Sequence, residues 1–366
     1  MSDSINPFEP YTQKRKTEDG AFSQAEVGLA NRNHGLLLET LEQDITPTGA
    51  HYLLNHFDVP LISEEDFALS FIGAFEKPFT MTMAEIRALD STSVPVTLEC
   101  AGNGRAGVSP RSHSMPWMYE AAGTSLWTGT PLAPLIEKAA PRSDVVDVSF
   151  TGADYGYDMG RGHHFGRSLT LEQLHELDVM LVYGMNGAPL LPQHGAPLRI
   201  IVPGWYGMAS VKWLTQIEAL IDPFEGYQQV GTYRFRSAAD EPGVPIQDMR
   251  VKSLMKPPGV PDWTTRQRLV EAGRHKLIGR AWSGLGRRID RVEVRIGDVW
   301  KDAEVTASAE KYAWSKWQFE WDAEPGVYVL QSRATDEAGN VQPLDPPWDV
   351  AGFANNAVQS VYVTVR

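Results

Sequence analysis

The stretch Val94-Pro95-Val96-Thr97-Leu98-Glu99-Cys100-Ala101-Gly102-Asn103-Gly104-Arg105 holds the most distinctive residue pattern of the chain. Its first half is an apolar run typical of a buried strand, and its second half is a Gly-Asn-Gly turn followed by an arginine. Cys100, at the junction, is the only cysteine among 366 residues. We therefore predict that a strand presents this thiol at the entry to a turn, where the Arg105 guanidinium would lower its pKa.

The lone cysteine limits the chemistry available to this thiol. It cannot form a disulfide within the chain, and it cannot supply a zinc site built from several thiolates. Three roles remain: a nucleophile, a soft ligand of a metal held mainly by other groups, or a small buried hydrophobe. A cysteine hydrolase would also need a general base beside the thiol, and the sequence has no nucleophile-elbow motif to support that role.

The charge of the chain disfavours some classes of partner. Lys plus Arg is 33 and Asp plus Glu is 46, so the formal net charge is −13. This excess of negative charge argues against sequence-independent nucleic-acid binding and against docking on anionic lipid. No stretch approaches the roughly 20 apolar residues of a membrane span, and the polar residues 1–20 lack the pattern of a secretory signal. We expect a mobile N-terminus and a cytoplasmic protein, or a periplasmic one if a leader precedes this sequence.

The first two thirds of the chain mix short helices with strands. Capping residues and helical spacing predict helices over 82–89, 132–139 and 171–177. Apolar runs predict buried strands over 145–150, 179–183 and 198–202. Glycine-rich connections, which often carry function when they are this long, join them over 101–116, 152–167 and 184–197.

From about Tyr233 onward the pattern becomes that of a β protein. Residues 240–261 are rich in proline and charge, which indicates a domain boundary. Alternating polar and apolar residues then predict strands over 291–296, 327–334 and 358–365. We predict an immunoglobulin-like β-sandwich over about 236–366. Four tryptophans would fill its core: Trp282, Trp314, Trp317 and Trp321.

Further motifs flank Cys100 in a fixed order. Before it come Asp44-Ile45-Thr46-Pro47 and Tyr52-Leu53-Leu54-Asn55-His56-Phe57-Asp58-Val59-Pro60. After it come Met185-Asn186-Gly187-Ala188-Pro189-Leu190, His194-Gly195-Ala196-Pro197-Leu198-Arg199, Val202-Pro203-Gly204 and Ser210-Val211-Lys212-Trp213-Leu214. The second part adds Gly279-Arg280-Ala281-Trp282-Ser283-Gly284, Tyr312-Ala313-Trp314 and Asn340-Val341-Gln342-Pro343. In order, spacing and residue content, these motifs and Cys-Ala-Gly-Asn resemble the sulfite oxidase family of molybdopterin enzymes over about residues 30–366.

The resemblance implies an α+β fold with three parts. A flexible segment over 1–30 would precede a mixed α/β molybdopterin-binding catalytic domain over 31–235, and an immunoglobulin-like domain over 236–366 would mediate a homodimer. The cofactor would be molybdenum bound by the dithiolene of a pterin, with the Cys100 thiolate as the protein ligand. Arg105 and Tyr233 would act with Cys100 in catalysis. The residues that would hold the pterin are Tyr52, Leu53, Leu54, Asn55, His56, Asp154, His194, Arg199, Ser210, Val211 and Lys212.

The sequence departs from the family pattern where arginines would bind the substrate. Leu54, Gly104 and Ala351 stand at positions where the family has arginine. The loss of three fixed positive charges from a low-dielectric pocket would weaken the binding of an oxyanion. The segment over 160–167 offers Arg161, His163, His164 and Arg167 as replacements, although an exposed polar loop would have the same composition.

The function that follows from the resemblance is oxygen-atom transfer at molybdenum, with sulfite or a related sulfur compound as the substrate. Electrons would pass to a separate acceptor such as a cytochrome, a quinone or dioxygen, because the sequence has no Cys-x-x-Cys-His haem attachment. Two alternatives stay open. The same centre could reduce an S-oxide or an N-oxide, or the chain could be a cofactor-free dimer with a binding or structural role.

Overall fold

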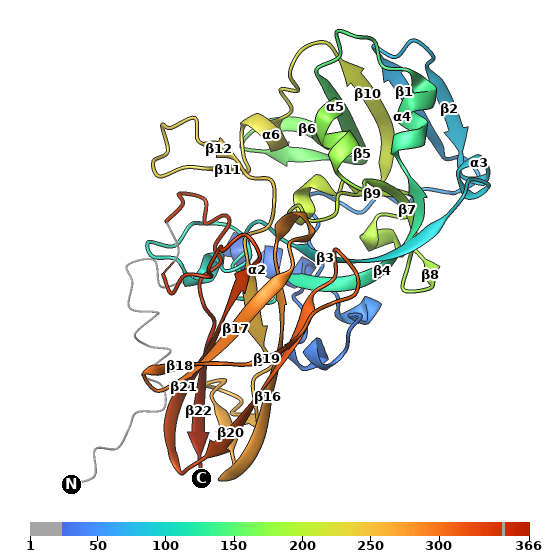
Figure 1. Ribbon diagram of the computed structural model, residues 1–366. Helices are drawn as coiled ribbons and strands as arrows, with labels where there is room; N and C mark the ends of the chain where they lie inside the picture. The colour runs from blue at the N-terminus through green and yellow to red at the C-terminus, as the bar shows by residue number, and fades with distance from the viewer. Residues whose placement is uncertain (1–23, 346–347) are drawn as a thin grey trace.

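The computed structural model describes residues 24–345 and 348–366. In Figure 1 the strands of residues 68–220, with short helices around them, occupy the upper part of the molecule, and the strands from β16 to β22 extend below them. None of the helices in the described residues is long and apolar enough to cross a membrane.

The first sheet has the strand order β2-β1-β10-β5-β6. Its members are β1 (Ala68–Gly73), β2 (Phe79–Thr82), β5 (Asp147–Asp158), β6 (Arg161–Thr170) and β10 (Leu214–Leu220). Strands β1 and β10 run parallel, and the other neighbours are antiparallel. Phe71 of β1 lies opposite Ile217 of β10, and both side chains are completely buried.

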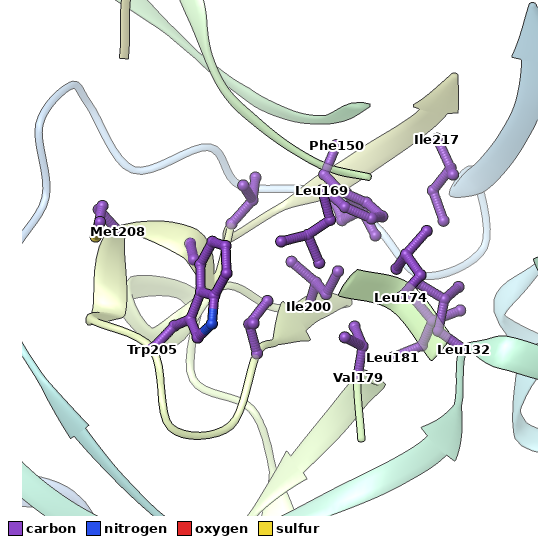
Figure 2. Packing of buried hydrophobic residues seen from close by; sticks show 14 of the residues in the cluster. Leu132, Phe150, Leu169, Leu174, Val179, Leu181, Ile200, Trp205, Met208 and Ile217 are labelled. Carbon is purple, nitrogen blue, oxygen red and sulfur yellow. The ribbon is translucent and has the colours of Figure 1, made fainter. Parts of the chain in front are cut away.

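The second sheet carries the Cys100 motif at the end of one strand. It contains β3 (Thr92–Glu99), β4 (Ala122–Pro131), β7 (Met180–Met185) and β8 (Ala188–Pro189) in that order, and β9 (Arg199–Ile201) pairs with β7. Leu181 and Ile200 of this sheet pack with Phe150, Leu169 and Ile217 of the first sheet (Figure 2). Full burial of each such side chain stabilises the fold by about 1.5–3 kcal/mol, so this contact holds the two sheets together.

Short helices begin where capping residues predict them. Helices α3 (Met83–Arg87) and α5 (Leu171–Glu176) each begin with a threonine capping box, at Thr82 and Thr170. The remaining helices within residues 24–345 and 348–366 are α2 (Gln24–Arg32), α4 (Ala133–Ala139) and α6 (Tyr227–Val230). The 3₁₀ turns are η1 (Leu38–Glu42), η2 (Thr48–Ala50), η3 (Arg105–Gly107), η4 (Pro192–His194), η5 (Gly207–Ala209) and η6 (Gly284–Gly286).

The connection expected over 152–167 is instead a long β-hairpin formed by β5 and β6. Asp158 pairs with Arg161, and the two residues between them form the turn. Met159 and Gly160 have φ values of 48° and 78°, which is the left-handed conformation that two-residue hairpin turns use. The glycines suggested a loop, but the alternation of aromatic and small residues on both sides supports pairing.

Two further sheets form the C-terminal part. One has the order β13-β16-β20-β19 and the other β14-β15-β22-β21-β17-β18. Their bounds are β13 (Lys252–Met255), β14 (Val260–Pro261), β15 (Arg268–Val270), β16 (Gly273–Trp282), β17 (Ile289–Ile296), β18 (Val299–Asp302), β19 (Glu304–Thr306), β20 (Ser315–Ala323), β21 (Gly326–Asp336) and β22 (Ser360–Val365). The predicted strands over 291–296, 327–334 and 358–365 are confirmed to within a few residues. Apolar side chains from both sheets form one core cluster between them.

The prediction for the tryptophans was half wrong. Trp317 and Trp321 belong to the core between the C-terminal sheets, whereas Trp282 and Trp314 belong to the larger core of the N-terminal part. The indole of Trp282 donates to Glu99 Oε2 over 2.9 Å, and that of Trp314 donates to the Asp44 carbonyl over 2.8 Å. Their polar edges thus find partners at the junction of the two parts, which a sandwich interior would not offer.

Two chain segments with irregular composition contain regular elements. Most of the predicted flexible segment over 1–30 lies outside the described residues, but 24–30 is part of helix α2, where buried Glu26 pairs with Arg111. The proline-rich stretch over 240–261 contains β13, a fully buried strand, and β12 (Val244–Pro245), which pairs with β11 (Arg234–Phe235). Pro245 is the last residue of β12, and β13 contains no proline, so the β13 ladder loses no donor.

Candidate functional site

Cys100 lies immediately after β3, as its sequence context predicts. Its amide donates to the Ala121 carbonyl over 2.9 Å, and its carbonyl accepts from the Asn103 amide over 2.9 Å, which turns the chain back. The Gly102 amide points at the sulfur, with 3.4 Å between N and Sγ. The side chain is 6% exposed, so the thiol reaches a cavity and not the outer surface.

The pKa of this thiol departs from the expectation. Burial raises the pKa of Cys100, while Arg105 and the Gly102 amide oppose that rise without overcoming it. A thiol without a bound cation therefore stays protonated in this site. Coordination to a metal ion would reverse the balance, because a bound cation stabilises the thiolate directly.

Arg105 folds back against the turn that carries the thiol. Its Nε donates to the Ala351 carbonyl over 2.7 Å, and its Nη1 donates to the Met115 carbonyl over 3.1 Å. A Cβ atom at Gly102 would lie 2.6 Å from both Nη atoms of this guanidinium, so a larger residue at position 102 would displace it. The guanidinium carbon also lies 5.0 Å from the centroid of the Phe353 ring.

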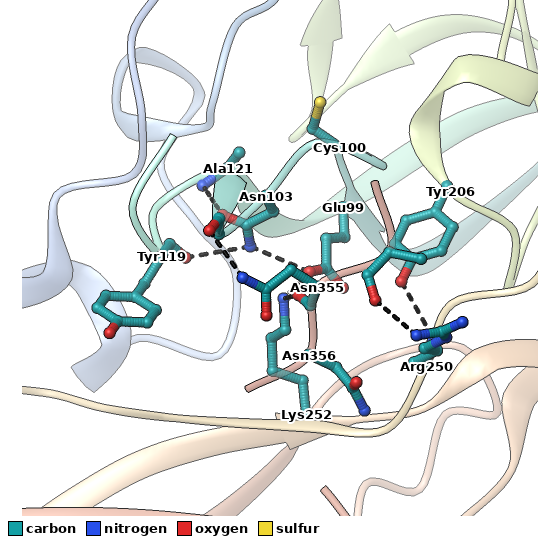
Figure 3. A network of polar contacts seen from close by, with 12 residues as sticks. Glu99, Cys100, Asn103, Tyr119, Ala121, Tyr206, Arg250, Lys252, Asn355 and Asn356 are labelled. Carbon is teal, nitrogen blue, oxygen red and sulfur yellow. Dashed lines mark hydrogen bonds and ion pairs between the residues drawn. The ribbon is translucent and has the colours of Figure 1, made fainter. Parts of the chain in front are cut away.

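A buried polar network fixes the other side of the turn (Figure 3). Glu99 and Lys252 form an ion pair with side chains that are at most 4% exposed. The Glu99 carboxylate also accepts from Asn103 Nδ2 over 3.0 Å and from the Trp282 indole over 2.9 Å. Lys252 Nζ donates to the Asn355 carbonyl over 2.9 Å as well. Residues of the C-terminal part thus hold the turn that presents Cys100.

A cleft of about 670 Å³, partly open to solvent, contains the thiol. The predicted site residues that line it are Tyr52, Leu53, Leu54, His56, Cys100, Asp154, His194, Arg199, Ser210, Lys212 and Tyr233. Six segments that are far apart in the sequence therefore meet at one place.

Three predicted residues do not line the cleft. Arg105 packs between Gly102 and Phe353, as described above, and Val211 is buried in the core between the first two sheets. The Asn55 side chain accepts from Lys212 Nζ, so Asn55 holds a lining residue in place.

Positive groups are concentrated on one wall of the cleft. Arg199 donates to the His194 carbonyl and the Ser210 carbonyl, each over 3.0 Å, while its Nε has no partner among the described residues. Lys212 Nζ donates to the Leu54 carbonyl over 2.9 Å and the Gln193 carbonyl over 3.2 Å. Burial lowers the pKa of Arg199 to about 10 and that of Lys212 well below its usual value. Such buried cations gain free energy when an anion enters.

Histidines and one carboxylate complete the polar lining. Burial lowers the pKa of His51 to about 4 and the pKa values of His56 and His194 to about 3, so all three are neutral near pH 7. Burial raises the pKa of Asp154 to about 6, against the opposing charge of Lys212. His51 Nε2 and Asp154 Oδ1 are buried without partners among the described residues.

Tyr233 occupies the side of the cleft that faces the C-terminal part. Its φ of 51° is a strained value for a tyrosine, which marks a conformation imposed by its surroundings. Its hydroxyl lies 2.7 Å from His56 Nε2, and its ring lies 4.9 Å from that of Phe353. Burial raises the pKa of Tyr233 while Arg105 and Arg167 oppose the rise, so the phenol keeps its proton.

Of the four residues proposed over 160–167, Arg167 lies beside Tyr233. Its guanidinium carbon lies 5.9 Å from the centroid of the Tyr233 ring. Arg161 and His164 are exposed, and His163 packs between Phe57 and Tyr227.

Sequence reasoning missed seven lining residues. They are His51, Leu98, Ala101, Phe165, Gly207, Met208 and Trp213. Leu98, Ala101 and Trp213 lie within motifs quoted above, and His51 adjoins one. Gly207 and Met208 fall in the short gap between two motifs. Phe165 could have been found from the hairpin pattern described above.

The described residues contain no group of three or more His, Cys, Asp or Glu side chains that could hold a metal ion. A metal bound at Cys100 would therefore take its other ligands from a cofactor or from solvent, which agrees with the lone cysteine of the sequence.

Comparisons with known proteins identify the domains of the chain. The family model of the oxidoreductase molybdopterin binding domain matches residues 56–228, and that of the Mo-co oxidoreductase dimerisation domain matches residues 244–366. The sulfane dehydrogenase SoxCD of Paracoccus pantotrophus has a similar structure, with a TM-score of 0.77 and 28% identity, over 89% of this chain and 83% of that chain.

Curated relatives with similar sequences include enzymes of two activities. The chain is 31% identical over 343 residues to NADH nitrate reductase 1 of Arabidopsis thaliana, a match covering 85% of this chain and 37% of that protein. It is 30% identical over 345 residues to the mitochondrial sulfite oxidase of Mus musculus, covering 88% of this chain and 62% of that protein. The chain therefore spans less than two thirds of the length of these relatives.

The cleft suits the molybdenum–molybdopterin cofactor that the matched domain implies. Cys100 offers one thiol, Arg199 and Lys212 offer positive charge for a phosphate, and Asp154 Oδ1 is a free acceptor for amino groups of a pterin. Glycine keeps space open beside two of these groups: a Cβ at Gly152 would lie 2.6 Å from Asp154 Oδ1, and one at Gly123 would lie 2.7 Å from His51 Cδ2. The cleft thus offers a thiol, positive groups and an acceptor of the kinds that this cofactor requires.

Proposed function

The chain belongs to the sulfite oxidase family of molybdopterin-dependent oxidoreductases, and from this membership we propose that it catalyses oxygen-atom transfer to a small sulfur oxyanion, with sulfite as the leading substrate. The observation that carries the proposal is the position of the Cys100 thiol in a cleft lined by Arg199, Lys212 and Tyr233. In the overall reaction, sulfite gains an oxygen atom from water and becomes sulfate, and two electrons and two protons are released. A separate acceptor, such as a cytochrome, a quinone or dioxygen, takes the electrons.

The predicted cofactor-binding residues divide by chemistry. Arg199, Lys212 and His194 would hold a phosphate, and Asp154 would accept from pterin amino groups. The other predicted lining residues, Tyr52, Leu53, Leu54, His56 and Ser210, would complete the wall around the cofactor. Cys100 would be the protein ligand of the metal, and its neighbour Glu99 would hold the turn in place through Lys252. When bound, the molybdenum centre supplies two-electron oxygen-atom chemistry.

The remaining task of the protein is to bind the oxyanion and to manage protons. Tyr233 carries its proton at physiological pH, because burial raises its pKa, and it can donate a hydrogen bond to an oxygen in the cleft. His56 is neutral, so its Nε2 can either accept a hydrogen bond from the phenol or donate one to it, depending on the tautomer, over the 2.7 Å contact. The net charge is the same in both cases. Arg105 adds positive charge behind the thiol.

At two of the three positions where the family has arginine, the residue of this chain takes part in another contact. Gly104 has φ of 90°, and a Cβ there would lie 2.9 Å from the Asn355 amide, so an arginine would not fit without moving that side chain. The Ala351 carbonyl accepts from Arg105. Leu54 lines the cleft with an apolar side chain. Substrate binding in this chain must therefore rest on arginines at other positions.

Turnover with defined substrates tests this proposal. Molybdenum-loaded wild-type protein should reduce ferricyanide when sulfite is added, and the rate should saturate with sulfite. Molybdenum-loaded protein that does not turn over sulfite, but does oxidise another sulfur compound, would refute the leading substrate while keeping the reaction type.

A second candidate function is reduction of an oxyanion or of an S-oxide or N-oxide at the same centre. The nitrate reductases among the relatives favour this direction. Nitrate-dependent oxidation of a reduced viologen, measured on the same preparation, separates the two candidates. Activity with nitrate and none with sulfite would assign the chain to the reductases.

We further propose a homodimer formed by an immunoglobulin-like sandwich over 236–366, after a catalytic domain over 31–235. The match to a dimerisation domain over 244–366 supports the dimer. The proposed boundary falls in the hairpin of β11 and β12, between the two matched regions. Light scattering coupled to size-exclusion chromatography should give twice the mass of the chain, and a monomer at micromolar concentration would contradict it.

A further inference from the structure

Two buried arginines approach Tyr233 from different parts of the chain. Arg167 projects from β6, with its guanidinium carbon 5.9 Å from the centroid of the Tyr233 ring. Arg105 follows the Cys100 turn and lies over Phe353, whose ring in turn stacks on Tyr233 with 4.9 Å between centroids. The side chains of Arg105 and Arg167 are 5% and 3% exposed.

The charge of Arg167 has no counter-ion among the described residues. Its Nη1 donates to the Gln228 carbonyl, its Nε is buried without a partner, and no carboxylate is among the charges that act on its pKa. Asp349 acts on Arg105, but that carboxylate already accepts the amides of Arg236, Ala351 and Phe353. A buried cation of this kind is costly unless an anion compensates it.

Arg167 is not one of the residues that line the cleft, but it lies beside lining residues. Phe165 precedes it by two residues on β6, so both side chains point to the same face of the sheet. Phe165 lines the cleft, and its ring centroid is 4.8 Å from that of His56. Tyr233 also lines the cleft and lies between His56, which its hydroxyl contacts, and Arg167.

We propose that Arg167 is a specificity-determining residue that, together with Arg105 and the Tyr233 hydroxyl, forms a subsite for a small oxyanion. It supplies the positive charge that the family pattern would place at Leu54, Gly104 and Ala351. This inference rests on the proposed function, since the cleft is the one assigned to the cofactor. The preferred ligand is then an anion with several oxygen atoms, and not a neutral S-oxide.

We expect the two guanidinium groups and the phenol to contact different oxygen atoms of the bound anion. Arginine is suited to this task because its planar N–H groups match the geometry of an oxyanion. A charge-assisted hydrogen bond contributes enough that its loss weakens binding by about tenfold or more.

Binding of sulfate to the molybdenum-loaded protein tests the proposal without turnover. Sulfate does not react further, and the loaded cofactor already fills the phosphate site, so its effect on the thermal unfolding temperature reports the subsite. In wild type we expect a saturable rise. Arg167→Met should weaken the apparent sulfate affinity by about tenfold or more, and Arg167→Lys should recover part of it. Arg274→Met, which removes the same charge from an exposed position of β16, should behave as wild type.

Kinetics add a second readout if sulfite turns over. Arg167→Met should raise the KM for sulfite more than it lowers kcat, because the side chain acts on binding. An Arg167→Met protein that keeps its molybdenum and binds sulfate within about twofold of wild type would overturn the proposal. A chain that oxidises no sulfite but binds sulfate through Arg167 would overturn only the proposed substrate.

A comparison of ligands on wild type decides the matter if neither variant keeps molybdenum. Sulfate should raise the unfolding temperature at concentrations where dimethyl sulfoxide has no effect. An equal effect of dimethyl sulfoxide, or the absence of any effect of sulfate, would show that no oxyanion subsite exists beside Tyr233.

Discussion

The position of Cys100 depends on a carboxylate that the metal would not touch. Glu99 is completely buried, and Lys252, Asn103 and Trp282 satisfy its two oxygens. Lys252 comes from β13, so the charge that neutralises Glu99 belongs to the C-terminal part of the chain. An ion pair of this kind adds little net stability compared with an apolar pair, but the loss of one partner leaves an uncompensated buried charge.

Replacement of Lys252 should therefore be costly. Lys252→Met should lower the free energy of unfolding by about 3–5 kcal/mol, measured by urea denaturation of the cofactor-free protein. Addition of Glu99→Gln should restore part of this loss, because the double variant no longer buries a lone charge. Equal stability of wild type and Lys252→Met would show that the pair is not buried in solution.

Gly102 controls the position of Arg105. A Cβ there would lie 2.6 Å from both Nη atoms, so Gly102→Ala should displace the guanidinium from the turn. We expect the KM for sulfite to rise by about tenfold, with molybdenum content retained. Gly107→Ala is the matched control, because a Cβ at Gly107 meets nothing within 4 Å. If Gly102→Ala kept the wild-type KM, Arg105 would have no part in substrate binding.

At the scale of elements, local signals in the sequence predicted much of the fold. Thr82 and Thr170 form the capping boxes that begin α3 and α5. The apolar runs over 179–183 and 198–202 became β7 and β9, because such residues are stable only in a covered sheet. Where local composition is ambiguous, the prediction failed. The glycines of β5 and β6 suggested a loop, although long-range pairing determines their structure.

In the candidate site, too, local motifs were predicted and long-range contacts were not. The motifs around Tyr52, Cys100, His194 and Lys212 brought most of the predicted lining residues into the prediction, because each motif is contiguous in sequence. Arg167 was only one of four candidates on its segment. Its contact with Tyr233 joins residues that are far apart in the sequence, and no local pattern records such a contact. The same reason explains why Trp282 was assigned to the wrong core.

At the scale of the whole molecule, the neutral histidines of the cleft make stability depend on pH. The pKa of His51 is about 4, and those of His56 and His194 are about 3, all below the unfolded value of 6.5. Depressed pKa values of this kind contribute stability above pH 6.5 that is lost as pH falls, at about 1.4 kcal/mol per pH unit for each histidine. Asp154, with its pKa raised to about 6, opposes this trend from one side chain.

The cofactor-free protein should accordingly unfold at a lower urea concentration at pH 5 than at pH 7.5. His194→Gln should reduce the difference between the two pH values, whereas His175→Gln, at an exposed position of α5, should leave it unchanged. Equal midpoints for wild type at both pH values would mean that the cleft histidines are not held neutral.

The central claim is that Cys100 is the protein ligand of molybdenum in a molybdopterin cleft. Elemental analysis of wild type and Cys100→Ser, both purified from a host able to make the pterin, tests it most directly when pterin content is measured on the same samples. We predict close to one molybdenum and one pterin per chain in wild type, and a loss of molybdenum in Cys100→Ser while part of the pterin remains. A wild-type protein free of molybdenum, or a Cys100→Ser variant that keeps the wild-type amount, would contradict the account.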